Sequence, residues 1–202
     1  MRQPHVYLAL LHLAAFLGAV AIGLTLYHWG QPLICTCGYV QFWVGSIFSN
    51  ENSQHIADWY TLSHFVHGLL IVLLGRWLVP GVGFVGLYSA AIITGVAWEI
   101  IEHTDWVLDL FRAATLYQGY RGDSVLNAVA DYLWMLSGFF LAFVLNPIWV
   151  VALVILLEVN SAVVARDSLA LTTLMLVYPI EAVDDWQQAI NPNRIPGNEQ
   201  DK

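Results

Sequence analysis

Long apolar segments alternate with short polar ones along the whole chain. The continuous apolar segments extend over residues 6–27, 61–79, 82–103, 124–145 and 148–165. Each has about the ~20 residues that an α-helix needs to cross a hydrocarbon core of ~30 Å. The pattern therefore predicts an all-α fold, a polytopic transmembrane helical bundle with five spans.

The segments outside these five spans are shorter or more polar. Residues 168–180 are apolar but too few for an ordinary span, and they predict a short sixth or re-entrant segment. Residues 104–122 are amphipathic and aromatic, which indicates an interfacial helix and loop. Residues 28–60 form the first loop, and its polar run at 49–60 is rich in side chains that bond their own backbone, so we expect ordered turns there. We expect a single transmembrane domain over residues 1–187 and a polar flexible tail over 188–202.

The composition agrees with a membrane-embedded chain. Of its 202 residues, 58% are hydrophobic and 11% are charged, whereas roughly a quarter are charged in a soluble domain. The partner predicted from this composition is the lipid bilayer. The formal net charge is −8 and no basic stripe is present, which excludes nucleic acid as a partner. Nothing in the sequence predicts a protein partner.

The only two cysteines, Cys35 and Cys37, are separated by one residue in the first loop. They are too close in sequence for an ordinary disulfide framework and too few for a closed zinc site. Three readings stay open, namely a redox pair, a soft-metal contact and two small loop residues. We favour the last.

The basic residues give a weak indication of orientation. Arg2 and Arg76 agree with a cytoplasmic N-terminus, and an uncleaved first span behind Arg2 is the simplest insertion route. Only if residues 168–180 cross the membrane do Arg194 and Lys202 join that side and give it a majority. Three arginines would face outward, against the positive-inside tendency: Arg112, Arg121 and Arg166. We expect a cytoplasmic N-terminus.

Ionisable residues within the apolar segments gather at one end of the predicted bundle. Near the end of the third span, Glu99, Glu102 and His103 follow Trp98 and share one helix face. Alternating topology brings the starts of the second and fourth spans and the end of the fifth to the same membrane face. Those ends carry His64, His67, Asp123, Asn127, Asp131, Glu158 and Asn160. Because ionisable groups in hydrocarbon are costly, the cluster predicts a functional site near the periplasmic face.

Imidazole with several carboxylates is a suitable ligand set for zinc, manganese or iron, and without metal it forms a general acid and base. The catalytic candidates are Glu99, Glu102, His64, His67 and Asp123. The candidate ligands of a divalent metal are His64, His67, Glu99 and Asp131. The candidates for binding a substrate head group are Arg112, Arg121 and Arg166. The alternative for each residue is a polar contact that holds two helices together, and only the clustering favours function.

These polar blocks resemble an uncharacterised family of bacterial, mainly alphaproteobacterial, multi-pass inner-membrane proteins, a domain of unknown function. The blocks that carry the resemblance are residues 51–60, 63–64, 67–68, 98–102, 122–124 with 127 and 131, 166–167 and 178–179. The resemblance implies a bacterial cell inner-membrane location and no particular reaction. The family tends to have Asn where His103 stands, so the expected chemistry centres on Glu99 and Glu102.

The sequence thus predicts a membrane protein with a polar site that suits a divalent metal, acting as a hydrolase or transferase on lipid or lipid-linked substrates. The alternative is a non-enzymatic membrane protein, either an assembly factor or a small transporter. A transporter predicts a polar path into the other half of the membrane. The apolar segments offer only His12 and Arg76 there.

Overall fold

The computed structural model describes residues 3–114, 116 and 119–192, and these form eight helices and no strand. Five of the helices are long and apolar enough to cross a membrane. They are α1 (Gln3–His28), α2 (Trp59–Leu78), α3 (Phe84–Glu102), α5 (Val125–Val144) and α6 (Pro147–Val164). The predicted all-α bundle with five spans is confirmed, and it indicates a multi-pass membrane protein.

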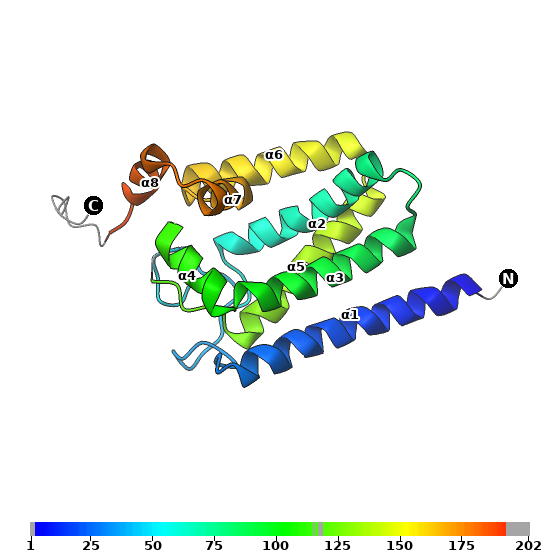
Figure 1. The fold of residues 1–202 in the computed structure, drawn as a ribbon, viewed down its shortest axis with the longest axis horizontal. Helices are drawn as coiled ribbons and strands as arrows, with labels where there is room; N and C mark the ends of the chain where they lie inside the picture. The colour runs from blue at the N-terminus through cyan, green and yellow to red at the C-terminus, as the bar shows by residue number, and fades with distance from the viewer. Residues whose placement is uncertain (1–2, 115, 117–118, 193–202) are drawn as a thin grey trace.

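The five long helices lie side by side, with α2 and α5 as the most extensive pair (Figure 1). Glycines allow these two helices to approach closely. A Cβ atom on Gly68 of α2 would lie 1.9 Å from the carbonyl oxygen of Met135, and one on Gly138 of α5 would lie 2.2 Å from that of Phe65. Helix α1 packs on α3 and α5, and α6 packs on α2.

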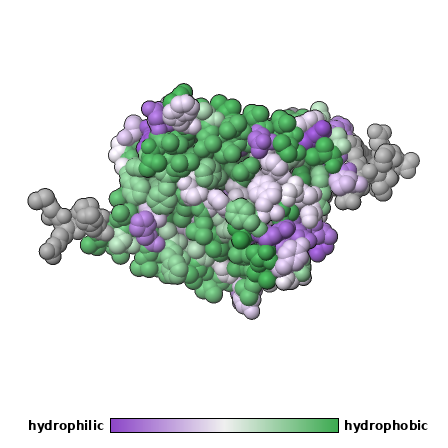
Figure 2. All heavy atoms as spheres, turned by 180° about the vertical axis from the view of Figure 1, so that it is seen from behind, coloured by the Kyte–Doolittle hydropathy of each residue, from purple (hydrophilic) through white to green (hydrophobic). Residues whose placement is uncertain are grey.

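The interior and the outer surface of the bundle are both apolar. Leu69 of α2 and Tyr132, Met135 and Phe139 of α5 are buried among the helices. Large apolar side chains are also exposed on the outside, and hydrophobic residues cover most of the face in Figure 2. A soluble protein rarely exposes so much apolar surface, whereas lipid tails would cover it.

Polar side chains fix where the helices begin. Asp58 caps α2 by accepting from the backbone N–H groups of Tyr60 and Thr61, and the Thr61 hydroxyl accepts from the Asp58 N–H in return. Ser124 caps α5 by accepting from the Asn127 N–H. Each such cap satisfies backbone donors that a helix start leaves without partners.

The loop between α1 and α2 folds over the end of the bundle and bonds to the start of α5. The Ser124 N–H donates to the Ser53 carbonyl at 3.0 Å, and the Asn127 side chain donates to the His55 carbonyl at 2.8 Å. Gln54 donates to the Gly122 carbonyl at 3.0 Å. The loop is therefore an ordered cover rather than a flexible connection.

Helix α4 (Asp105–Ala114) lies within the amphipathic segment at 104–122, at the same end of the bundle as the loop (Figure 1). Its apolar side chains Val107, Leu108 and Phe111 pack with Tyr120, and Trp98 of α3 adjoins them. The helix therefore lies against the end of α3 with its apolar face inward.

The chain after α6 leaves this end of the bundle and returns to it. Helix α7 (Leu169–Val177) has only 9 residues, and α8 (Glu181–Gln188) follows it. The Arg166 guanidinium donates to the Trp186 carbonyl and lies over the Trp186 ring, while the Gln187 side chain donates to the Arg166 carbonyl at 2.8 Å. With 9 residues, helix α7 is too short to cross a hydrocarbon core of ~30 Å by itself.

The C-terminal part contains a helix that the sequence pattern does not predict. The polar segment from residue 181 forms helix α8, in which Gln187 is buried and Gln188 donates to the Leu116 carbonyl at 3.1 Å. Because α7 is too short to cross by itself, the arginine majority that depended on a sixth span has no support. Arg2, Arg194, Lys202 and most of the predicted 188–202 tail lie outside the described residues.

Candidate functional site

A cavity of about 240 Å³ lies at the polar end of the bundle. Helices α2, α3, α4, α5 and α7 contribute to its wall, together with the loops that hold Ser53, Tyr120 and Asp123. The lining residues are Ser53, Tyr60, Ser63, His64, His67, Trp98, Glu102, Phe111, Tyr120, Asp123, Asp131, Leu169, Thr172 and Thr173. Five of the predicted site residues line this cavity, namely His64, His67, Glu102, Asp123 and Asp131.

Three carboxylates meet beside this cavity. Glu99 and Glu102 lie one turn apart on α3, and Asp123 lies two residues before α5 begins. One oxygen of each lies within 4.8 Å of one oxygen of the other two. The Oε2 atoms of Glu99 and Glu102 are buried and have no hydrogen-bond partner among the described residues. Buried oxygens without partners need a proton or a cation nearby.

The imidazole of His64 links α2 to α3 and to α5. Its Nδ1 atom lies 3.3 Å from Oε1 of Glu99 on α3, and its Nε2 atom lies 3.9 Å from Oδ2 of Asp131 on α5. Asp131 is held by the Thr61 hydroxyl, which donates to its Oδ1 at 2.8 Å. His67, one turn along α2, also lines the cavity. Of the residues predicted from sequence, the two histidines and the four carboxylates are therefore brought together.

His103 has a different surrounding, because both of its ring nitrogens are engaged by the backbone. Nδ1 lies 2.7 Å from the Glu99 carbonyl oxygen, and Nε2 accepts from the Asp123 N–H at 2.8 Å. These contacts require the neutral ring with its hydrogen on Nδ1. His103 therefore positions Asp123 relative to α3 and offers no free nitrogen to a ligand.

Tyr120 bridges two of the carboxylates, and the sequence pattern does not single it out. Its hydroxyl lies 2.7 Å from Oδ1 of Asp123 and 3.2 Å from Oε1 of Glu102. Burial, followed by the nearby Asp123 charge, raises the pKa of Tyr120 well above 10, so the hydroxyl keeps its proton and donates it. The feature of the sequence that could have identified Tyr120 is its position three residues before Asp123, in a loop next to the cluster.

Burial also raises the pKa of two acids just outside the spanning helices, Asp123 and Asp58. It raises the pKa of the Asp123 carboxyl, while the Tyr120 hydrogen bond acts in the opposite direction. Burial raises the pKa of Asp58 to about 6, although three backbone N–H groups partly stabilise its charged form. Asp58 supports Thr61 and so, indirectly, Asp131.

The three arginines predicted to bind a head group do not line the cavity. Arg112 donates to the Tyr120 carbonyl at 2.8 Å and forms an ion pair with Asp109. Arg121 is exposed. Arg166 contacts Trp186 of α8. Glu158, also part of the predicted convergence, accepts from the Ala170 N–H at the start of α7 instead of facing the cavity.

The cavity is lined by both acidic and apolar side chains. No lysine or arginine is among the described residues that line it, and the remaining surface includes Trp98, Phe111 and Leu169. Such a site can hold a cation against the carboxylates and an apolar group against the aromatic rings.

Comparisons with known proteins agree with the family resemblance. A family model described as a protein of unknown function, DUF2585, matches residues 26–189. A UPF0314 protein of Paracoccus denitrificans is 47% identical over 179 residues, which cover 88% of this chain and 92% of the relative. UPF0314 proteins of Rhizobium meliloti and Sphingopyxis alaskensis are 43% and 42% identical, over 90% and 87% of this chain and 93% and 90% of the relatives. No solved structure matches. The chain belongs to the DUF2585 family.

Proposed function

We propose that this protein holds a divalent metal between Glu99, Glu102 and Asp123 and acts as a hydrolase or transferase on lipid or lipid-linked substrates. The observation that supports this most directly is the pair of buried carboxylate oxygens, on Glu99 and Glu102, that lack partners among the described residues. A third carboxylate lies within 4.8 Å of both groups. A divalent cation would satisfy these oxygens and offset their mutual repulsion.

The donor atoms fit manganese, iron or zinc better than a soft metal. The three acids supply hard oxygen ligands, and the His64 imidazole beside Glu99 supplies a nitrogen. His67 and Asp131 complete the proposed ligand set as neighbours of His64. Thr61 and Tyr120 hold Asp131 and Asp123 in place, as the supporting residues of metal sites commonly do.

The proposed chemistry uses the residues around the cation in distinct roles. A bound metal would polarise a phosphoryl or acyl oxygen and activate a water molecule. His64 has its other nitrogen, Nε2, toward Asp131, and that carboxylate would orient the ring as a ligand. Tyr120 carries a proton that it shares between Asp123 and Glu102, which keeps both carboxylates oriented.

The surroundings of the cavity favour an amphiphilic substrate. Trp98, Phe111 and Leu169 offer apolar lining that suits an acyl or prenyl chain, whereas the acidic side chains offer polar lining. Arg112 follows Phe111 directly on α4 and is the arginine we propose for an anionic head group. Arg121 and Arg166 are proposed only as more distant contributors.

We place the protein in the bacterial inner membrane with this cavity at the periplasmic face. The support for the orientation is the bond between Cys35 and Cys37 in the loop at the same end, because disulfides persist in oxidising compartments. The arginines do not support it, since Arg112, Arg121 and Arg166 belong to this end. Fusion of a reporter that is active only in the periplasm after residue 192 tests the orientation.

A transporter is not favoured by the interior of the bundle. Between the cavity and Arg76, the side chains of Leu69, Val72 and Phe139 are buried in an apolar cluster. An ion or polar solute would have no polar path through this part of the described chain. An assembly factor remains the competing class, and the following experiment separates it from an enzyme.

The proposed function is tested by rescuing a deletion strain with Glu99→Gln and by profiling its lipids. This variant keeps the shape of the side chain and removes the charge that a metal needs. The matched control is Glu158→Gln, because Glu158 also lies in a spanning helix but outside the cavity. We expect a lipid change in the deletion strain that Glu158→Gln reverses and Glu99→Gln does not. Full rescue by Glu99→Gln at normal protein level would favour an assembly factor.

A further inference from the structure

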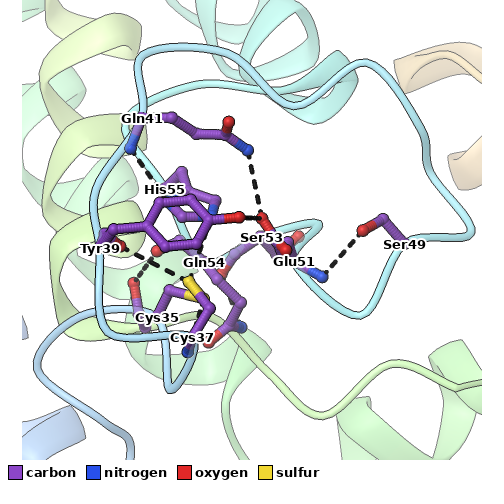
Figure 3. The surroundings of a disulfide bond; sticks show 10 residues. Cys35, Cys37, Tyr39, Gln41, Ser49, Glu51, Ser53, Gln54 and His55 are labelled. Carbon is purple, nitrogen blue, oxygen red and sulfur yellow. Dashed lines mark hydrogen bonds and ion pairs between the residues drawn. A yellow bond between two sulfur atoms is a disulfide. The ribbon is translucent and has the colours of Figure 1, made fainter.

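The loop between α1 and α2 contains a second cluster of reactive groups, separate from the carboxylate cavity. Cys35 and Cys37 are joined by a disulfide whose Cα atoms lie 5.1 Å apart (Figure 3). Their surroundings differ, since Cys35 is only 4% exposed whereas Cys37 is at the surface. An attacking group from outside can therefore approach the sulfur of Cys37 more easily than that of Cys35.

His55 lies directly beside the exposed sulfur. Its Nε2 atom is 3.8 Å from Sγ of Cys37 and 3.1 Å from Oε2 of Glu51. The Gln41 N–H donates to Nδ1 at 3.2 Å, so the neutral ring carries its hydrogen on Nε2. That hydrogen points toward the carboxylate and the sulfur, where it can stabilise a thiolate on Cys37.

Tyr39 and Glu51 hold the imidazole in this position (Figure 3). The Tyr39 ring stacks on the His55 ring with centroids 5.4 Å apart, and its hydroxyl donates to Glu51 at 2.7 Å. These two hydrogen bonds, from Tyr39 and from His55, lower the pKa of Glu51, so its carboxylate stays charged. The charged Glu51 accepts from Nε2 of His55 and so keeps that N–H beside the sulfur of Cys37.

The buried sulfur also has a group that stabilises negative charge. The backbone N–H of Cys37 donates to Sγ of Cys35 at 3.1 Å. If the bond between the sulfurs breaks with the electron pair going to Cys35, this N–H is already in place to bond the new thiolate. The surroundings of the two cysteines therefore suit different roles. Cys37 is the attacked sulfur, and Cys35 is the leaving group.

We propose that Cys35, Cys37 and His55 form a thiol–disulfide exchange site that oxidises a dithiol at the membrane surface. A thiolate of the substrate attacks Sγ of Cys37, the bond to Cys35 breaks, and Cys35 leaves as a thiolate that takes up a proton. The second substrate thiolate then attacks the substrate sulfur of the mixed disulfide. Cys37 leaves as a thiolate next to His55 and is protonated. In the balance, two substrate thiols become one disulfide and the protein disulfide becomes two thiols.

The substrate class follows from the exposure of the loop. Cys37 and its neighbours Gly38, Tyr39 and Val40 are exposed, which gives a polypeptide or small dithiol direct access. The competing reading is a soft-metal site, because single donor atoms of Cys35, Cys37 and His55 lie within 4.8 Å of one another. That reading is less favoured, since the Nε2 hydrogen of His55 faces the sulfur and the group found among the described residues has three ligands rather than four.

The test uses the full-length protein purified in detergent, with single-cysteine variants. In Cys35→Ser the exposed Cys37 should react with the aromatic disulfide 5,5′-dithiobis(2-nitrobenzoic acid) about tenfold or more faster than Cys35 does in Cys37→Ser. Adding His55→Gln to Cys35→Ser should slow that reaction several-fold at pH 7 and move its pH profile upward. His28→Gln, in the exposed end of α1, is the matched control and should change neither.

Two results would overturn the proposal. One is equal reaction rates of the two single-cysteine variants, with no effect of His55→Gln. The other is a wild-type protein that is isolated with both thiols reduced and with one equivalent of zinc, lost in each cysteine variant. The supporting result is a wild-type protein that has no free thiols, gains two on treatment with dithiothreitol, and oxidises that dithiol in a one-to-one ratio. Circular dichroism of each variant verifies that the helices are intact.

Discussion

The Nδ1 atom of His64 lies 3.3 Å from Oε1 of Glu99, so an imidazole of α2 and a carboxylate of α3 meet inside the bundle. The two residues are far apart in sequence, and their contact depends on how α2 and α3 pack against α5. The geometry of the candidate site is therefore a consequence of helix packing. Changes that alter the packing should change the site even when they lie far from it.

Gly68→Ala should destabilise the bundle and disturb the site. The added Cβ would lie 1.9 Å from the Met135 carbonyl oxygen, which forces α2 and α5 apart. We expect a loss of about 1–3 kcal/mol in stability, measured by thermal unfolding in detergent. Gly81→Ala is the control, because nothing lies within 4 Å of a Cβ there. Equal melting temperatures for the two variants would show that α2 and α5 do not approach as described.

His103→Asn should be tolerated, whereas His103→Leu should not. An asparagine side chain can donate to the Glu99 carbonyl and accept from the Asp123 N–H, as His103 does. Leucine offers neither bond and leaves a buried backbone N–H without a partner, which costs about 1–3 kcal/mol. Melting temperatures of the two variants, compared with wild type, check this. If asparagine were as harmful as leucine, His103 would be doing something other than positioning Asp123.

Tyr120→Phe should weaken metal binding without unfolding the protein. The hydroxyl that lies 2.7 Å from Asp123 and 3.2 Å from Glu102 is removed, while the ring that packs on Phe111 remains. Loss of such a supporting hydrogen bond commonly lowers metal affinity by about 10–100-fold. Titration of metal-free protein with Mn²⁺ measures the effect, with Tyr178→Phe at an exposed position as the control. Unchanged affinity would contradict the role of Tyr120.

Asp167 should make the protein less stable as the pH rises. Burial raises its pKa from 3.8 to about 6, although bonds from Thr172, the Ser168 N–H and Tyr60 partly oppose this. Because folding disfavours the charged carboxylate, its contribution to stability is greatest below pH 3.8 and is lost as the pH rises through about 6. The free energy of unfolding of Asp167→Asn should therefore increase relative to that of wild type, by about 1–3 kcal/mol, as the pH rises from 5 to 7.5. A constant difference in melting temperature across that range would contradict the shift.

The spanning helices could be predicted from sequence because their signal is local. A run of about twenty apolar residues is sufficient to identify α1, α2, α3, α5 and α6. Helix α8 could not be predicted, since residues 181–188 are polar and their helix depends on Arg166 and Leu116, far away in the chain. The hydrogen bonds of Gln187 to Arg166 and of Gln188 to Leu116 also hold α8 at the polar end of the bundle.

The candidate site shows the same division between local and distant information. Alternating topology was enough to bring His64, Glu99 and Asp131 to one end of the bundle, because an ionisable residue inside an apolar run is conspicuous. The arginines were expected in the site on charge alone, but they lie in segments whose positions are set by tertiary contacts such as that of Arg166 with Trp186. Tyr120 was not expected, because a tyrosine in an aromatic loop is not conspicuous in sequence.

Metal analysis of the detergent-purified protein shows directly whether the acids beside the cavity hold a divalent metal. Wild-type protein is loaded with Mn²⁺ or Zn²⁺, freed of excess metal and measured by elemental mass spectrometry beside Glu99→Gln, Glu102→Gln and the control Glu158→Gln. We predict about one metal ion per chain in wild type and control, and a loss of most of it in the other two variants, whose helical spectra stay unchanged. Absence of bound metal from wild type, or equal metal in all four proteins, would contradict the account.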